Sequence, residues 1–257
     1  MNKHSCPIGR RMLPYLQADA GRPILCLNGI GMPADIAGHL EPFMSRAGLA
    51  CLSPEWRGAW PAVVGTWPRL RRMAGVLARL LDHVGVARLP VLGHSWGGAL
   101  AQEFARRHPD RVSHLILANT TAGAFMLPGK LDGLFEFLSP GLYRTGPGRN
   151  ARRSQLRRLP SVDAKLAGWQ FTALNGWTSI HWLHRLNMPT LLIAGERDSL
   201  VRPVNVKIVA SRLPHGELHW VPGGSHMCLY TRADELVPRI ASFVGSGSGG
   251  GDAPHRQ

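Results

Sequence analysis

A serine stands between two glycines in the segment GHSWG at residues 93–97. The apolar residues before it predict a strand, and the residues after it predict a helix that runs through Leu100 and Phe104. Glycines allow close backbone approach at such a sharp turn, and the turn lifts a serine hydroxyl above the edge of the sheet. The context favours Ser95 as a nucleophile over an incidental helix-capping serine.

A serine hydroxyl needs a general base, and after this type of turn the chain order is serine, acid, histidine. His226 lies in VPGGSHMC, on a glycine-containing loop between an expected strand and the last expected helix. His219 falls inside that strand, whereas His181 and His184 belong to an inserted segment. We therefore expect His226 to be the base.

The acid is expected after the preceding parallel strand, where PTLLIAG leads into Glu196, Arg197 and Asp198. We expect Asp198 to be the acid and keep Glu196 as the second choice. The acid holds the imidazole in the useful tautomer and stabilises the imidazolium. A plain turn aspartate is the alternative reading.

Ester chemistry also requires N–H donors for the developing oxyanion. One is expected from Trp96, the residue that follows the nucleophile. The other is expected from the turn Asn28-Gly29-Ile30-Gly31 after the first apolar strand, with the N–H of Ile30 favoured. An ordinary glycine turn is the alternative here.

Along the chain, short apolar runs alternate with segments of helical periodicity, and these elements must position the residues named above. Strands are expected within residues 23–29, 49–54, 89–95, 112–119, 189–195 and 217–223. Helices are expected near residues 36–46, 73–84, 204–212 and 233–244, in addition to the one through Leu100 and Phe104. This rhythm predicts an α/β fold with a mostly parallel, doubly wound sheet.

The expected organisation is one domain with an insertion. Residues 1–22 form a short N-terminal lead-in, residues 23–244 the α/β domain, and residues 245–257 a flexible Gly/Ser-rich tail. Residues 121–186, rich in Gly, Pro, Arg and aromatic residues, interrupt the rhythm and are expected to form a short helical cap after the sixth strand.

Composition restricts partners and compartment. No run approaches the roughly 20 apolar residues of a membrane-spanning helix, and the scattered cysteines favour a reducing compartment over a disulfide scaffold or a metal site. We expect a cytoplasmic protein. The net charge of +14 and the arginines at 144–158 could attract nucleic acid, but no aromatic residues interleave as stacking platforms, so a solvated basic face is favoured.

Four segments carry a more particular resemblance: LNGIG at 27–31, GHSWGGALAQEFA at 93–105, ANTTAGAFMLPGK at 118–130 and GWTSIHWLHRLNMPTLLIAGERDSLV at 176–201. In these the chain resembles the intracellular poly(3-hydroxyalkanoate) depolymerases of medium-chain-length polyesters, which have the α/β-hydrolase fold. The resemblance spans roughly residues 23–243. Carried over by position, it implies Ser95, Asp198 and His226 as the triad and Asn28 to Gly31 as the oxyanion turn.

The resemblance further implies a serine hydrolase that needs neither cofactor nor metal, with a granule-associated storage polymer as substrate. Apolar residues at 131–138, with Trp177 and Trp182, could form the approach surface. Three departures affect the expected substrate: the first 22 residues leave room for little more than one strand, the loop at 55–60 keeps only part of the family's pattern, and the cap is shortened between residues 130 and 177.

Two other functions remain open at this point. A small-molecule carboxylesterase or an acyltransferase would use the same triad with a different substrate or acceptor. A protein of another class, a non-catalytic homologue that binds a ligand or a granule, would keep the fold without the reaction. The oligomeric state does not follow from the sequence.

Overall fold

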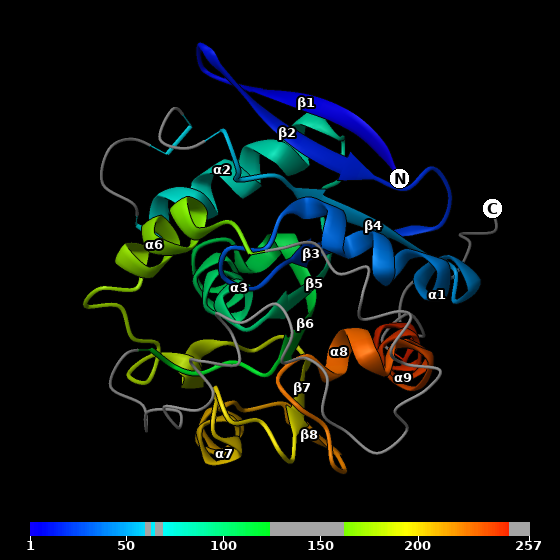
Figure 1. Cartoon of the computed structure of the whole chain (residues 1–257), viewed down its shortest axis with the longest axis vertical. Coiled ribbons are helices and arrows are strands. Elements are labelled where there is room, and N and C mark those ends of the chain that lie inside the picture. Colours follow the sequence, from blue (N-terminus) through cyan, green and yellow to red (C-terminus); the bar gives the residue numbers. More distant parts are fainter. Residues whose placement is uncertain (60–62, 65–68, 124–161, 247–257) are drawn as a thin grey trace, which may run out of the picture.

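The computed structural model describes residues 1–59, 63–64, 69–123 and 162–246. An eight-stranded sheet forms the centre, in the order β1-β2-β4-β3-β5-β6-β7-β8 (Figure 1). Strands β3 to β8 pair in parallel, and β1 and β2 join antiparallel. The strands are β1 Asn2–Ile8, β2 Arg11–Gln17, β3 Arg22–Leu27, β4 Leu49–Pro54, β5 Leu89–His94, β6 Val112–Ala118, β7 Thr190–Gly195 and β8 Gly216–Val221.

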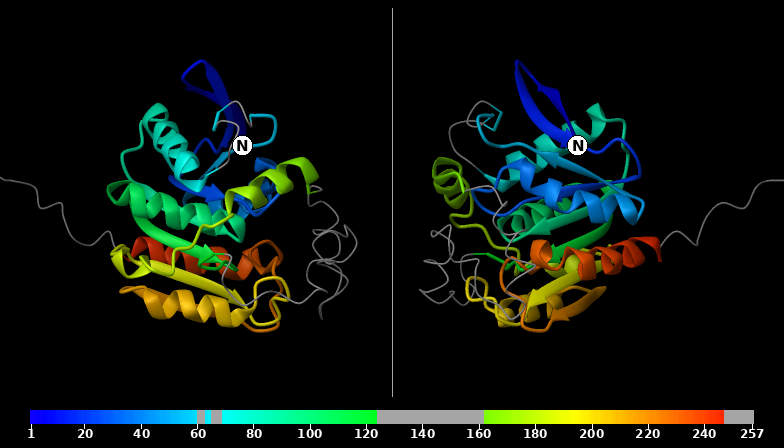
Figure 2. Two further views of the ribbon diagram at one scale, coloured as in Figure 1. Left: turned by 90° about the vertical axis from the view of Figure 1, so that its left-hand side faces the viewer. Right: turned by 45° about the vertical axis from the view of Figure 1, so that its right-hand side comes forward.

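Helices cover both faces of this sheet (Figure 2). The core on one face includes side chains of α2, α3 and α7, and the core on the other includes side chains of α1 and α9. The helical segments are η1 Ala34–His39, α1 Glu41–Arg46, α2 Leu70–His83, α3 Trp96–Arg107, η2 Pro109–Arg111, α6 Ala164–Ala173, η3 Leu183–Arg185, α7 Pro203–Arg212, α8 Cys228–Thr231 and α9 Ala233–Gly245. The expected α/β fold with a mostly parallel, doubly wound sheet is confirmed.

Helix α2 illustrates why the periodic segments fold as expected. Met73, Leu77, Leu80 and Leu81 are fully buried and recur at helical spacing along one side. The strands between the helices read as continuous apolar runs because both faces of a parallel sheet are covered. All six residues of β4, β5 and β7 are buried.

The N-terminal segment differs from the expectation of little more than one strand. Two seven-residue strands, β1 and β2, fit within the first 17 residues because only Gly9 and Arg10 connect them. Gly9 has φ of +62°, which a two-residue hairpin with glycine at its first central position requires. Because β2 pairs with β4, this segment extends the main sheet rather than leading into it.

Several expectations fall on residues outside the described ranges. These are the arginines at 144–158, the apolar residues at 131–138, the shortening after residue 130, Trp60 of the 55–60 loop, and the tail from residue 247. Of the expected cap, the structure describes residues 121–123 and 162–186, including helix α6.

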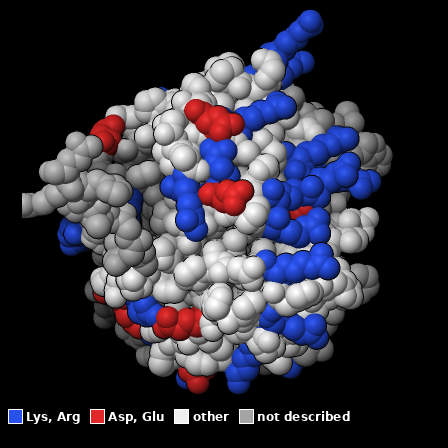
Figure 3. All heavy atoms as spheres, turned by 180° about the vertical axis from the view of Figure 1, so that it is seen from behind, with Lys and Arg blue, Asp and Glu red and all other residues white. Residues whose placement is uncertain are grey.

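The excess positive charge extends well beyond that arginine segment. Lys and Arg side chains gather on the face opposite to that of Figure 1 (Figure 3). Helices α2 and α3 alone expose Arg71, Arg72, Arg79, Arg106 and Arg107. Among the described helices, none is long and apolar enough to cross a membrane.

Candidate active site

Ser95 occupies a strained turn between β5 and α3. Its φ of 52° and ψ of −118° are unusual for a residue with a side chain, and its N–H donates to the carbonyl of Ala118 on β6 at 2.9 Å. Strain of this kind persists only where the surroundings enforce it, and it clusters at functional sites. Here the surroundings are tight, because a Cβ at Gly93 would lie 2.7 Å from the Cα of Gly98.

The structure brings Ser95, His226 and Asp198 together in one hydrogen-bonded chain. Ser95 Oγ lies 2.9 Å from His226 Nε2, and His226 Nδ1 lies 2.8 Å from Asp198 Oδ2. The three residues come from the ends of β5, β7 and β8, which meet at one edge of the sheet because these strands are parallel. The arrangement can pass a proton from the serine hydroxyl to the imidazole.

Asp198 is buried with both carboxylate oxygens occupied. Oδ1 accepts from the N–H groups of Leu200 at 2.9 Å and Val201 at 2.8 Å, whereas Oδ2 faces His226 and Asn119. Burial alone would raise the pKa of Asp198, but the charge and hydrogen bond of His226, with further hydrogen bonds from Asn119 and Val201, hold the pKa below its ordinary value. The side chain is therefore a carboxylate.

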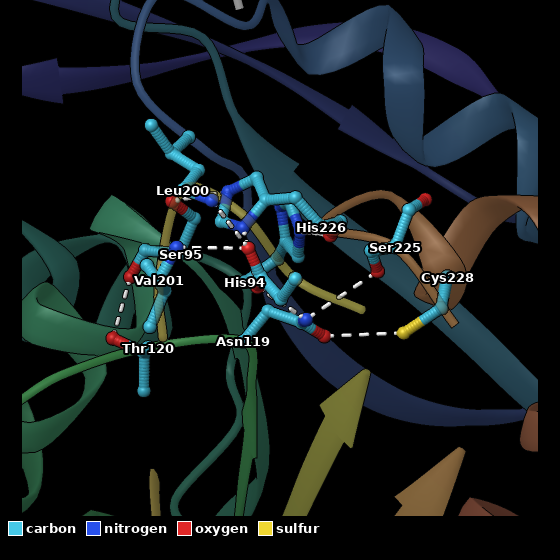
Figure 4. Close-up of polar contacts among 10 residues, drawn as sticks. His94, Ser95, Asn119, Thr120, Leu200, Val201, Ser225, His226 and Cys228 are labelled. Atoms are coloured by element: carbon cyan, nitrogen blue, oxygen red, sulfur yellow. Dashed lines mark hydrogen bonds and ion pairs between the residues drawn. The ribbon is translucent and has the colours of Figure 1, made fainter. Parts of the chain in front are cut away.

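Two residues that sequence reasoning missed complete the support of Asp198. Asn119, fully buried at the end of β6, donates from Nδ2 to Asp198 Oδ2 at 2.6 Å. Cys228 donates its thiol proton to Asn119 Oδ1 at 3.2 Å (Figure 4). Burial, with the nearby charge of Asp198, raises the pKa of Cys228 to about 12, so the thiol stays protonated and fixes the orientation of the amide. The sequence signal for Asn119 is its place directly after β6, which lies between β5 and β7.

His94 lies directly behind the imidazole of His226. Its Nε2 is 2.9 Å from the carbonyl oxygen of His226, so Nε2 carries the proton and holds the loop of the base. Burial, and then the charge of His226, lowers the pKa of His94 to about 3. His94 is therefore neutral, and its Nδ1 has no hydrogen-bond partner in the described part of the chain.

The neutral state of His94 predicts a specific pH dependence of stability. Its folded pKa of about 3 lies below the ordinary 6.5, so below pH 6.5 the unfolded chain binds the extra proton. The stability from this group is full above pH 6.5 and falls towards pH 3, by up to about 1.4 kcal/mol per pH unit. His94→Gln keeps a donor for the His226 carbonyl but does not titrate. In urea titrations between pH 7 and 4, the free energy of unfolding of this variant should fall less steeply with decreasing pH than that of wild type. Equal slopes for the two proteins would contradict the prediction.

The two expected oxyanion donors lie in turns with free N–H groups. Within the described ranges, neither the N–H of Ile30 nor that of Trp96 has an acceptor in the surrounding structure. Trp96 opens helix α3, where the first N–H groups lack intrahelical partners. The N–H of Gly31 is not free to bind an oxyanion, because it donates to Gln170 Oε1 at 2.5 Å. Asn28 steadies the turn by donating to Ser53 Oγ at 3.2 Å, and Gly29 faces His94.

The residues weighed as alternatives lie elsewhere. The carboxylate of Glu196 accepts from the N–H of Gly223 at 2.8 Å, His219 lies within β8, and His181 and His184 are exposed. Trp182 is buried, and the ring N–H of Trp177 donates to Glu103. These two tryptophans pack against the domain rather than presenting an exposed approach surface.

Comparison with known proteins defines the class. Residues 22–233 match the family model of the alpha/beta hydrolase fold. Among solved structures, an esterase from Rhodococcus sp. ECU1013 superposes with a TM-score of 0.80 over 96% of this chain and 99% of its own, at 17% identity, a likeness of fold alone. The chain therefore belongs to the α/β-hydrolase family and is a hydrolase.

A more particular likeness lies within that family. The chain is 36% identical over 241 residues to the poly(3-hydroxyalkanoate) depolymerase of Ectopseudomonas oleovorans, covering 86% of this chain and 84% of that protein. A putative carbamate hydrolase of Azorhizobium caulinodans is 28% identical over 88% of this chain and 92% of its own. The resemblance to the poly(3-hydroxyalkanoate) depolymerase family is thus confirmed.

Proposed function

We propose that this hydrolase is a serine esterase that cleaves the 3-hydroxyacyl ester bonds of poly(3-hydroxyalkanoate). The observation that carries the proposal is the chain from Ser95 Oγ through His226 to Asp198, with links of 2.9 Å and 2.8 Å. The identity of 36% to a poly(3-hydroxyalkanoate) depolymerase supports the choice of ester.

In the first half-reaction, Ser95 Oγ attacks the ester carbonyl carbon while His226 Nε2 takes the hydroxyl proton. Asp198 stabilises the resulting imidazolium. The oxyanion of the tetrahedral intermediate accepts hydrogen bonds from the N–H groups of Ile30 and Trp96. The intermediate then collapses, the bond to the alcohol oxygen breaks, and His226 gives its proton to the departing hydroxyl end of the polymer.

In the second half-reaction, water attacks the acyl-serine carbonyl and gives a proton to His226 Nε2. The tetrahedral intermediate again uses the same two N–H donors. Collapse breaks the bond to Ser95 Oγ, which recovers its proton from His226 and releases a 3-hydroxyacyl carboxylic acid. The sequence of steps balances with water as the only co-reactant and uses no metal or organic cofactor.

The proposed setting is the surface of a storage granule in the cytoplasm. A segment of the insoluble polymer must reach Ser95. Because the polymer is apolar, this requires exposed apolar surface near the cap. Phe171 on α6 supports this, because 70% of its surface is exposed and the preceding residue, Gln170, contacts the oxyanion turn.

The test is hydrolysis of an amorphous medium-chain poly(3-hydroxyalkanoate) suspension, run beside p-nitrophenyl esters of short and long acyl chains. Wild type should clear the polymer and release 3-hydroxy acids, and Ser95→Ala should do neither. Cleavage of the soluble esters alone would instead identify a small-molecule esterase. A folded protein that cuts neither substrate would point to a binding protein without catalysis.

A further inference from the structure

Gln170 of helix α6 is hydrogen-bonded to both turns that carry the proposed oxyanion donors. Its Oε1 accepts from the N–H of Gly31 at 2.5 Å, next to Ile30. Its backbone carbonyl accepts from the indole N–H of Trp96 at 2.8 Å, next to Ser95. Only 1% of the residue is exposed, so both bonds are shielded from water.

The start of the same helix is fitted against the oxyanion turn. The N–H of Asp163, the residue that caps α6, donates to the carbonyl of Gly31 at 2.9 Å. Gly31 has φ of +66°, and a Cβ there would lie 2.5 Å from Val162 Cγ1 and 2.9 Å from Ala167 Cβ. A side chain at Gly31 would therefore clash with the start of α6, and hydrogen bonds from Asp163 and to Gln170 tie the turn to this helix.

The two donors follow neighbouring strands, and Gln170 adds a direct link between their turns. Ile30 follows β3, whereas Trp96 follows β5 and opens α3. An oxyanion requires both N–H groups at about 2.7–3.1 Å at once, and an error of about 1 Å in position costs about 100-fold in rate. Gln170 is bonded to both turns, and its side chain accepts from the N–H of Gly31, the residue next to Ile30.

We propose that Gln170 is a positioning residue that sets the spacing between the oxyanion donors Ile30 and Trp96. The proposal rests on the proposed esterase function. It assigns the described part of the cap a role in the reaction itself, in addition to any contact with substrate. Gln170 acts through the two turns and not by contact with the reacting atoms.

The first test replaces Gln170 with methionine, which has similar length and helix propensity but no acceptor. The N–H of Gly31 then loses its partner and the turn shifts. We expect kcat for a p-nitrophenyl ester to fall about 10- to 100-fold with KM within about twofold of wild type. The inhibition constant of an alkyl boronic acid, whose tetrahedral serine adduct uses the same donors, should rise by a similar factor.

The second test uses Gln170→Glu, which keeps an acceptor at the same place but adds an ionisable group. Burial raises the pKa of an introduced carboxyl, and its protonated form can still accept from Gly31. The ratio of variant to wild-type kcat should therefore be highest at low pH and fall as the carboxyl ionises beside the developing oxyanion. A ratio that does not change with pH would count against the proposal.

Thr172→Ala is the matched control, because Thr172 is exposed on the same helix and its hydroxyl donates to the carbonyl of Trp169 at 2.7 Å, away from both turns. It should leave kcat and the boronic acid constant within twofold of wild type. Unchanged kcat in Gln170→Met, a loss confined to KM, or a loss of kcat with an unchanged boronic acid constant would each overturn the proposal. If wild type neither cleaves esters nor binds the boronic acid, the proposed esterase function is wrong, and the proposal on Gln170 fails with it.

Discussion

Replacing both Ser95 and His226 with alanine is expected to lower kcat no further than either replacement alone. Each single change should cost about 10⁵- to 10⁶-fold on a soluble ester, because the serine hydroxyl is unreactive without the base and the base is idle without the serine. The 2.9 Å contact between Ser95 Oγ and His226 Nε2 makes the two side chains one functional unit. The measurement is kcat for the two single variants and the double variant, with thermal unfolding midpoints to verify folding.

His184→Ala provides the control, since His184 is exposed and lies outside the hydrogen-bonded chain. Its kcat should stay within about twofold of wild type. Losses that multiply in the double variant would show that Ser95 and His226 act independently, and a His226 variant that keeps most of its activity would assign the base to another group.

The proposed triad could be chosen from the sequence because its members have a defined order and place in the chain. Ser95, Asp198 and His226 each follow an expected strand, and parallel strands place such residues at one edge of the sheet. Their convergence within hydrogen-bond distance agrees with this order, and Glu196, the second choice, points to Gly223 instead.

The supporting contacts could not be predicted in this way because they join residues far apart in the chain. Asn119 meets Asp198 across 79 positions, Cys228 meets Asn119 across 109, and Gln170 meets Gly31 across 139. No periodicity or spacing encodes such pairs, since each depends on how separately folded elements pack. The polar type of a buried residue is the single local clue, and burial itself follows from the packing.

The N-terminal hairpin was missed for a different reason, which is local. Two strands exceed what the first 22 residues hold if a long loop joins them, but the Gly9-Arg10 turn uses only two residues. A glycine followed by a polar residue between two possible strands is a hairpin signal. The sequence therefore contained the information on the hairpin, whereas nothing in it indicated the contact of Gln170 with Gly31.

Gly97→Ala is expected to destabilise the fold by about 3 kcal/mol, near the upper end of the usual cost of overpacking. A Cβ at this position would overlap the carbonyl of Leu27 and lie 2.6 Å from the carbonyl oxygen of Asn28. Both neighbours are backbone atoms, so no side-chain rotation relieves the clash and α3 must move away from β3. The measurement is the free energy of unfolding from urea titration, together with kcat.

Gly75→Ala is the matched comparison, because Gly75 lies inside α2 with nothing within 4 Å of its added Cβ. That change should be neutral or stabilising by up to about 1 kcal/mol. Equal stability of Gly97→Ala and wild type would contradict the prediction.

The carbonyls that exclude a side chain at Gly97 belong to the end of β3 and the start of the turn that carries Ile30. The same close contact lies between α3 and the start of the turn that carries Ile30, so this variant should lose stability and kcat together.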